Sequence, residues 1–209
     1  VQRMFGCVVK VLDPSDPRYH SDAAKAAIAK ELNVLREKSV ADFTKVQEWD
    51  DIKAAGGDDE LVGFKIIVGI KHYEEGEEHH IYKARGCVTG NCVQDIFGHQ
   101  VFEDDLYGRS VAMTGARVVM AQTLLEGGDL EQADANNAYC QAKLKGPQQW
   151  LKLPKHLWPA EWSGMKCPVI PLERALYGLV RSNFDWNDHC DSKLLGAGWR
   201  RCWSGEKLS

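Results

Sequence analysis

The chain has 209 residues, with 26 basic residues against 30 acidic ones and a formal net charge of −4. Its 44% apolar and 27% charged residues are ordinary globular values, which exclude a disordered tail protein, and its mild acidity excludes a uniformly basic, histone-like binder. The length corresponds to one or two domains and is sufficient for a sizeable core.

The first half of the chain predicts one helix and one β-hairpin. Residues 22–36 are rich in alanine, have Ser21 or Asp22 as the cap and carry apolar side chains on one stripe, as an amphipathic helix does. Residues 51–60 contain a Gly-Gly pair and read as a loop. The β-branched run 61–70, the acidic turn 74–77 and the return strand 80–86 have the pattern of a hairpin.

The second half predicts two further helices and a strand. Residues 110–125 read as a helix that is capped by Ser110 and ends before a Gly-Gly pair, and a strand is expected around residues 130–135. Ser182 and Asp185 have the spacing of a capping box, which would open a helix that ends near Gly196. This irregular order of strands and helices predicts an α+β fold rather than a doubly wound sheet.

The sequence shows no targeting or membrane-spanning segment. No secretory leader pattern opens the chain, and no window approaches about 18 uncharged apolar residues. The seven cysteines are irregularly spaced, without a CxxC pair, which favours reduced thiols. We expect an intracellular protein, cytoplasmic or nuclear, with no membrane partner. The start at Val1 and the end soon after Trp203 predict a piece of a longer protein.

Charge is unevenly distributed along the chain. Residues 47–80 hold ten acids against three lysines, a local charge of −7, and residues 141–181 hold seven bases against two acids, a local charge of +5. Aromatic residues, among them Trp150, Trp158 and Trp162, are interleaved with the bases, as in a groove that grips a nucleic-acid backbone and stacks its bases. A solvated surface face is the alternative for both stretches.

Three short segments could carry chemistry. Asp134 to Tyr139 places an acid, an Asn-rich turn and an aromatic in sequence, which suits a metal-binding carboxylate beside a nucleotide pocket or simply a turn. In the return strand, alternation puts Lys83 and Arg85 on one face, where two cations could clamp a triphosphate or face solvent. Residues 174–182 alone read as a helix–helix junction.

Together and in this order, the three segments resemble the reverse transcriptase of copia-type LTR retrotransposons. Pol proteins of that family carry Y-K-A-R, then D-V-x-N-A-F, then A-L-Y-G-L-K-Q-S-P-x-x-W. Here the corresponding segments are Tyr82–Arg85, Asp134–Tyr139 and Ala175–Trp186. Lys30–Leu35 is similar to the family's E-E-L-x-A-L helix and Gly63–Lys71 to its G-x-K-W-V-F-K-I-K strand. The resemblance spans about residues 23–203.

The resemblance implies the fingers and partial palm of a right-hand polymerase, an α+β fold with a mixed or antiparallel sheet and packed helices. Residues 1–22 would form an N-terminal flank and residues 23–109 the fingers-like part. Residues 110–209 would form a partial palm, truncated before the family's Y-x-D-D motif, which this sequence lacks.

The resemblance also assigns roles to individual residues. Asp134 would be the catalytic aspartate and a metal ligand, Ala135 would complete the coordination through its carbonyl, and Tyr139 would exclude a ribose 2′-hydroxyl. The other expected nucleotide-binding residues are Lys71, Lys83, Arg85, Gly178 and Ser182. The basic stretch adds the expected nucleic-acid-binding residues Lys143, Lys145, Lys152, Lys155, Arg174 and Arg181.

The implied activity is RNA-directed DNA polymerisation by two-metal nucleotidyl transfer with Mg²⁺ in the intact parent. The implied partners are an RNA or DNA template with its primer, deoxynucleoside triphosphates, and flanking integrase and RNase H modules of a polyprotein. The second metal site is incomplete, because the carboxylates of the Y-x-D-D motif are missing. Asp185, Asp188 and Asp191, at i, i+3 and i+6, are better explained as a solvated helix face than as substitutes for them. The alternatives are a catalytically dead nucleic-acid-binding remnant and an unrelated soluble domain.

Overall fold

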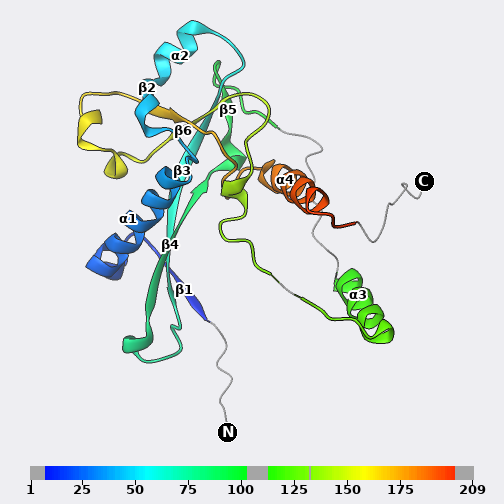
Figure 1. Cartoon of the computed structure of the whole chain (residues 1–209). Coiled ribbons are helices and arrows are strands. Elements are labelled where there is room, and N and C mark those ends of the chain that lie inside the picture. The colour runs from blue at the N-terminus through cyan, green and yellow to red at the C-terminus, as the bar shows by residue number, and fades with distance from the viewer. Residues whose placement is uncertain (1–7, 103–112, 132, 201–209) are drawn as a thin grey trace.

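The computed structural model describes residues 8–102, 113–131 and 133–200 and has an α+β fold. The strands are β1 (Val9–Leu12), β2 (Gln47–Glu48), β3 (Glu60–Lys71), β4 (Ile81–Val88), β5 (Gln94–Asp95), β6 (Gln149–Lys152) and β7 (Pro168–Pro171). The helices are α1 (Asp22–Glu37), α2 (Trp49–Ala55), α3 (Met113–Glu126) and α4 (Ser182–Gly196). The strands form one mixed sheet in the order β1-β3-β6-β7-β2, with β4 and β5 also paired to β3 (Figure 1).

The predicted hairpin is confirmed and contains the central strand of the sheet. β3 and β4 pair antiparallel from Phe64 opposite Val88 to Lys71 opposite Ile81, and the acidic turn lies between them. β1 pairs with the same half of β3, whereas β5 and β6 pair with its first residues. The β3–β6 pairing is parallel and the other pairings are antiparallel, so the sheet is mixed.

The predicted first helix is also confirmed. The Ser21 hydroxyl accepts a hydrogen bond from the Ala24 amide at 3.2 Å, which satisfies one of the free amides at the helix start. α1 packs against β4 and buries Leu35 in a core with Phe64 and side chains of β6 and β7. The Glu31 carboxylate accepts the Gly86 amide of β4 at 2.9 Å.

Several predicted elements differ from the structure. Residues 51–60 are not all loop, because α2 runs to Ala55 and buries Trp49 and Ile52, three residues apart, in one apolar cluster. The described residues between 130 and 135 are exposed and form no strand, since no neighbouring strand accepts their hydrogen bonds. The helix predicted over residues 110–125 is present as α3, but its expected cap, Ser110, lies outside the described residues.

The capping box expected at the start of α4 is also absent. Arg181 is the cap residue, and Ser182 is already the first residue of the helix. The Ser182 hydroxyl donates instead to the Leu176 carbonyl at 2.5 Å, because it is buried beneath the preceding turn.

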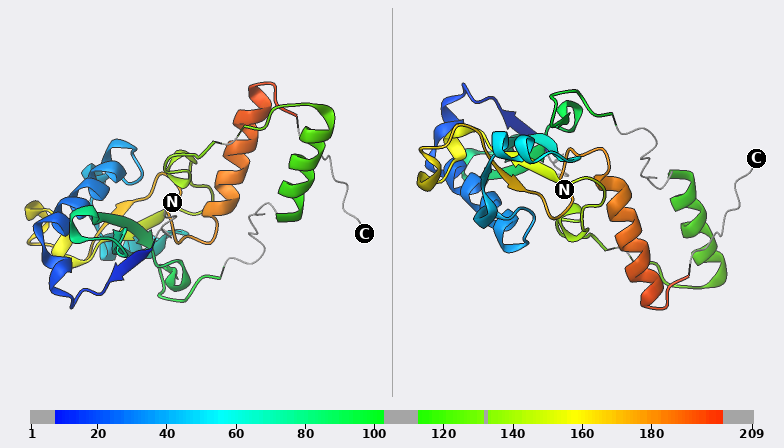
Figure 2. Two further views of the ribbon diagram at one scale, coloured as in Figure 1. Left: turned by 90° about the horizontal axis from the view of Figure 1, so that it is seen from below. Right: turned by 90° about the horizontal axis from the view of Figure 1, so that it is seen from above.

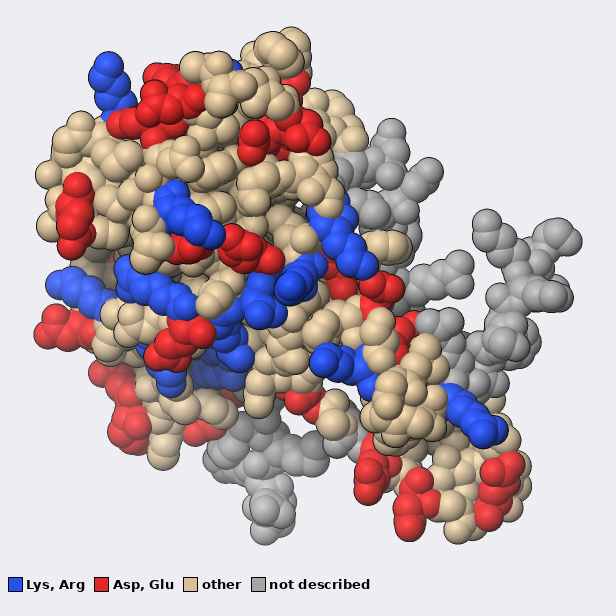
Figure 3. All heavy atoms as spheres, turned by 45° about the horizontal axis from the view of Figure 1, so that its top comes forward, with Lys and Arg blue, Asp and Glu red and all other residues tan. Residues whose placement is uncertain are grey.

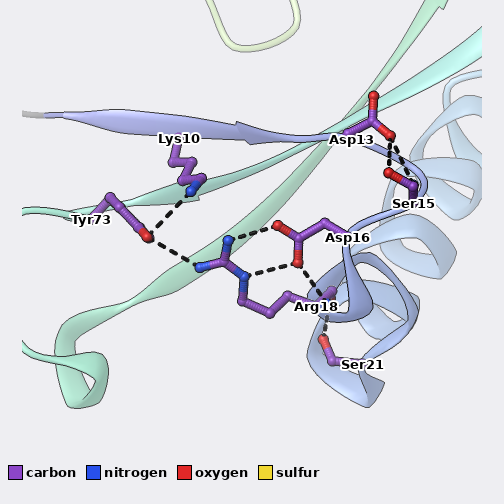
Figure 4. Close-up of polar contacts among 7 residues, drawn as sticks. All are labelled: Lys10, Asp13, Ser15, Asp16, Arg18, Ser21 and Tyr73. Carbon is purple, nitrogen blue, oxygen red and sulfur yellow. Dashed lines mark hydrogen bonds and ion pairs between the residues drawn. The ribbon is translucent and has the colours of Figure 1, made fainter.

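A polar cluster ties the N-terminal segment to the turn of the hairpin (Figure 4). The Tyr73 hydroxyl accepts from Lys10 at 3.4 Å and from Arg18 at 3.2 Å, and both bonds lower the pKa of the tyrosine. Arg18 also pairs with Asp16 at 2.7 Å. These contacts join β1 and the segment before α1 to the far end of β3.

α3 lies away from the sheet and does not pack against it (Figures 1 and 2). None of its residues is buried, and Leu124 and Leu125 are more than four-fifths exposed. Among the described residues, no helix has both the length and the apolar character that a bilayer crossing requires.

The end of β4 meets the segment before α4 at Gly178. The Val88 amide donates to the Tyr177 carbonyl at 2.7 Å. Gly178 has φ +97°, and a Cβ atom added there would lie 2.0 Å from the Val88 carbonyl oxygen. Glycine is therefore required both by the backbone conformation and by the approach of β4.

We expect Gly178→Ala to lower the free energy of unfolding by about 3 kcal/mol, because it adds backbone strain and a clash with backbone that cannot rotate away. Gly164→Ala is the matched control, since a Cβ atom there meets nothing within 4 Å. Urea titration followed by circular dichroism measures both changes. Equal stability of the two variants would contradict this close approach.

Candidate functional site

The expected site residues converge on a cleft of about 570 Å³. We define the cleft by its lining residues, which are Lys83, Arg85, Asp134, Ala135, Asn136, Asn137, Ala138, Tyr139, Tyr177, Asn183, Trp186 and Asn187. They come from β4, from the turn before residue 141, from the segment before α4 and from α4 itself. All three segments of the sequence resemblance therefore contribute to one concave surface.

β4 supplies the positive side of the cleft. Lys83 and Arg85 are exposed, whereas Ala84 between them is 5% exposed and packs in a core with Val68 of β3. The alternation of a strand thus places both cations on the face that carries the cleft. Two positive side chains two residues apart suit a ligand with several neighbouring negative groups, such as a polyphosphate.

Two tyrosines form an aromatic wall beside these cations. The Arg85 guanidinium lies over the Tyr177 ring, 4.5 Å from its centroid. Tyr139 meets Tyr177 edge to face, with the ring centroids 4.9 Å apart. Partial burial raises the pKa of the Tyr177 hydroxyl. The stacking limits the freedom of the guanidinium before any ligand arrives.

Hydrogen bonds fix the turn that carries Asp134. The Gln141 side chain donates to the Asn136 carbonyl at 2.9 Å, and Arg174 donates to the Gln141 carbonyl at 2.9 Å. Cys140 is buried below the turn, and burial raises the pKa of its thiol to about 11. Asp134 itself is exposed on the cleft side.

Three of the expected nucleotide-binding residues do not line the cleft. Lys71 lies in a neighbouring cavity of about 430 Å³, which shares Lys83 and Asn137 with the cleft. Gly178 packs against β4, and the Ser182 hydroxyl is used inside the fold.

The sequence reasoning missed the two asparagines and the tryptophan that α4 adds to the cleft, Asn183, Asn187 and Trp186. Trp186 occupies the position of the tryptophan that ends the family's A-L-Y-G-L-K-Q-S-P-x-x-W segment, so the resemblance contained a signal for it.

The cleft does not fit a two-metal centre. Asp134 is the only carboxylate among the described lining residues, and two divalent ions bound side by side need more than one. Asp185 is not on a solvated face as expected, because it is 2% exposed and pairs with Arg181 at 3.0 Å. The described residues contain one group of three potential metal ligands, His72, Glu74 and Glu75, which lies in the hairpin turn and is partly exposed.

The basic stretch divides between the surface and the interior. Arg181 is 9% exposed and its charge is compensated by Asp185 inside the fold, while Lys145 pairs with Asp188 at the surface. Lys152 and Lys155 are exposed. Lys143 and Arg174 line a different cavity.

Two of the interleaved tryptophans do not act as a stacking platform. Trp150 is 8% exposed and donates its indole N–H to Asp59 at 2.6 Å, and Trp162 is 4% exposed in the core. The expectation that they stack on bases is wrong, because apolar burial uses their ring faces.

No protein-family model, curated protein or solved structure matches this chain.

We expect Asp185→Asn to lower the free energy of unfolding by about 3 kcal/mol, because it removes the buried carboxylate that pairs with the Arg181 guanidinium at 3.0 Å. Asp188→Asn is the control on the same helix, and it should cost much less because its pair with Lys145 is exposed. Chemical denaturation measures both. A larger loss in Asp188→Asn would contradict the internal role of Arg181.

Proposed function

We propose that this chain is the fingers and first part of the palm of a copia-like reverse transcriptase, an RNA-directed DNA polymerase. The single observation that carries the proposal is that the Y-K-A-R, D-A-N-N-A-Y and A-L-Y-G-L segments, far apart in the sequence, line one cleft. The proposal includes an intracellular location, cytoplasmic or nuclear, and a parent polyprotein with integrase and RNase H modules.

In this proposal the cleft binds a deoxynucleoside triphosphate. Lys83 and Arg85 neutralise the triphosphate, and the aromatic wall of Tyr139 and Tyr177 packs against the sugar and base. A planar guanidinium stacked on a ring can direct two N–H groups at one phosphate, which a mobile ammonium group cannot do as well. Asp134 supplies a hard oxygen ligand for one Mg²⁺ of the bound nucleotide.

A second candidate is a nucleic-acid-binding remnant without catalysis. The presence of a single carboxylate in the cleft favours it, because nucleotidyl transfer by two metals requires several. The exposed Lys152 and Lys155 could hold a template with its primer through the phosphate backbone.

We expect Arg85→Ala and Lys83→Ala each to weaken binding of a fluorescent deoxynucleoside triphosphate about tenfold, because each removes a charged contact to phosphate. Fluorescence anisotropy in the presence of Mg²⁺ measures the affinities. Lys65→Ala is the control, since Lys65 is exposed on the adjacent strand β3 but does not line the cleft. Unchanged affinity in both cleft variants would remove the case for a triphosphate site.

Primer extension tests whether the isolated chain is itself catalytic. We expect the isolated chain to bind a primer–template and to extend it undetectably, because the described cleft lacks the carboxylates for a second metal. Wild type and Asp134→Asn are compared on an RNA template with Mg²⁺ and all four deoxynucleotides. Extension by the wild type that disappears in Asp134→Asn would show that the chain recruits further carboxylates and is itself an enzyme.

A further inference from the structure

A second cavity, of about 650 Å³, lies between the C-terminal end of α1, the segment 39–45 and the two chain segments 143–144 and 173–174. It shares no lining residue with the cleft. We call it the cationic cavity. Its lining includes Arg36, Phe43, Lys45, Lys143, Leu144 and Arg174.

Positive charge predominates in the cationic cavity. Four basic side chains line it, against two carboxylates, Asp42 and Glu173. Both carboxylates lie beside Lys45, at 3.2 Å and 3.6 Å from its ammonium nitrogen. The other three cations, Arg36, Lys143 and Arg174, make no ion pair within the described part of the chain. They are therefore available to an anion. Figure 3 shows that Lys and Arg side chains, whichever cavity they line, gather in a band across one face of the molecule.

The cavity also has an apolar wall. Phe43 and Leu144 line it together with Ala41, so its surface is not that of a simple anion site. The Arg36 guanidinium lies over the Phe43 ring at 4.5 Å from its centroid, and the ring is backed on the core side by Trp162. The face of this guanidinium that Phe43 does not cover offers a plane on which a base can stack.

The positions of the cations are set in advance by the fold. Arg174 donates to the Gln141 carbonyl, and its backbone amide bonds to the Val40 carbonyl at 3.2 Å. Lys143 lies opposite Arg174 in an antiparallel bridge between the two chain segments. Binding would therefore lose little freedom of these side chains, because contacts within the protein already restrict Arg36 and Arg174.

We propose that the cationic cavity binds one nucleotide unit, with its phosphate at Lys143 and Arg174 and its base against Leu144 and the face of the Arg36 guanidinium that Phe43 does not cover. A ligand with an anionic group and a flat apolar body matches the two halves of the cavity, whereas an inorganic anion would leave the apolar wall unused. The unit is part of a single strand or a free nucleotide. The inference rests on the proposed function only in taking nucleic acid as a partner of the protein, because the cavity is separate from the cleft.

The test compares full-length wild type with Arg36→Glu/Lys143→Glu, using a labelled single-stranded thymidine oligonucleotide and fluorescence anisotropy. We expect the affinity of the double variant to fall about tenfold at low salt and the slope of log K against log salt to decrease, because phosphate contacts are lost. Lys25→Glu/Lys166→Glu makes the same change of charge at exposed positions outside both cavities and should leave binding nearly unchanged.

Arg36→Lys tests the stacking plane separately. It retains the charge but removes the planar group, so we expect weaker binding with an unchanged salt slope. Thymidine monophosphate is the second probe. Displacement of the oligonucleotide by the monophosphate in wild type assigns the cavity to free nucleotides, and its failure to displace assigns the cavity to a strand. Both results support a nucleotide unit.

Wild-type oligonucleotide affinity in Arg36→Glu/Lys143→Glu would overturn the inference. Triphosphate binding that depends on Lys83 and Arg85 is measured on the same proteins. If triphosphate binding is absent but oligonucleotide binding depends on the cavity, the proposed function is refuted and the inference about the cationic cavity is supported. The presence of triphosphate binding, with cavity-independent oligonucleotide binding, would refute only the cavity.

Discussion

The backbone of β3 is the constraint on which the rest of the structure depends. Its twelve residues provide hydrogen-bonding edges to β1 and β4 along one half and to β5 and β6 along the other. Every buried peptide group needs a partner, so the register along β3 fixes where each neighbouring strand lies. The position of β4 in turn decides where Lys83 and Arg85 stand.

Three backbone contacts then bring distant segments to the end of β4. The Tyr177 carbonyl accepts the Val88 amide, and the Ala142 carbonyl accepts the Ala175 amide at 3.0 Å. The Leu144 amide donates to the Glu173 carbonyl, which continues the same pairing. The turn with Asp134, the aromatic wall and the strand with the two cations are thereby held around one cleft. The same pairing of segments places Lys143 opposite Arg174 in the lining of the cationic cavity.

The bases of residues 141–181 lie in different environments, although they form one basic stretch in the sequence. Arg181 is compensated within the fold and Lys145 forms an exposed pair. Lys143 and Arg174 face a cavity and make no ion pair with the residues that the structure describes. Trp150 and Trp162 contribute to cores although they lie between these bases in the sequence. Charge density along a chain therefore predicts a basic surface only where the side chains are not drawn into the interior by apolar neighbours or by a buried acid.

Local patterns predicted the elements that depend on near neighbours. The serine cap and apolar stripe specified α1, and the alternation of β4 specified that Lys83 and Arg85 share a face, because a cap and a pleat involve residues only a few positions apart. The same patterns were wrong for residues 130–135 and for the start of α4. A strand needs a partner from elsewhere in the chain, and Ser182 is drawn inward by a carbonyl that the preceding turn presents. Arg181 and Asp185 are one helical turn apart, so their pairing is local, but their burial depends on packing against the rest of the fold. Arg36 and Lys143, far apart in the sequence, line one cavity because distant segments pack together, which only the tertiary structure decides.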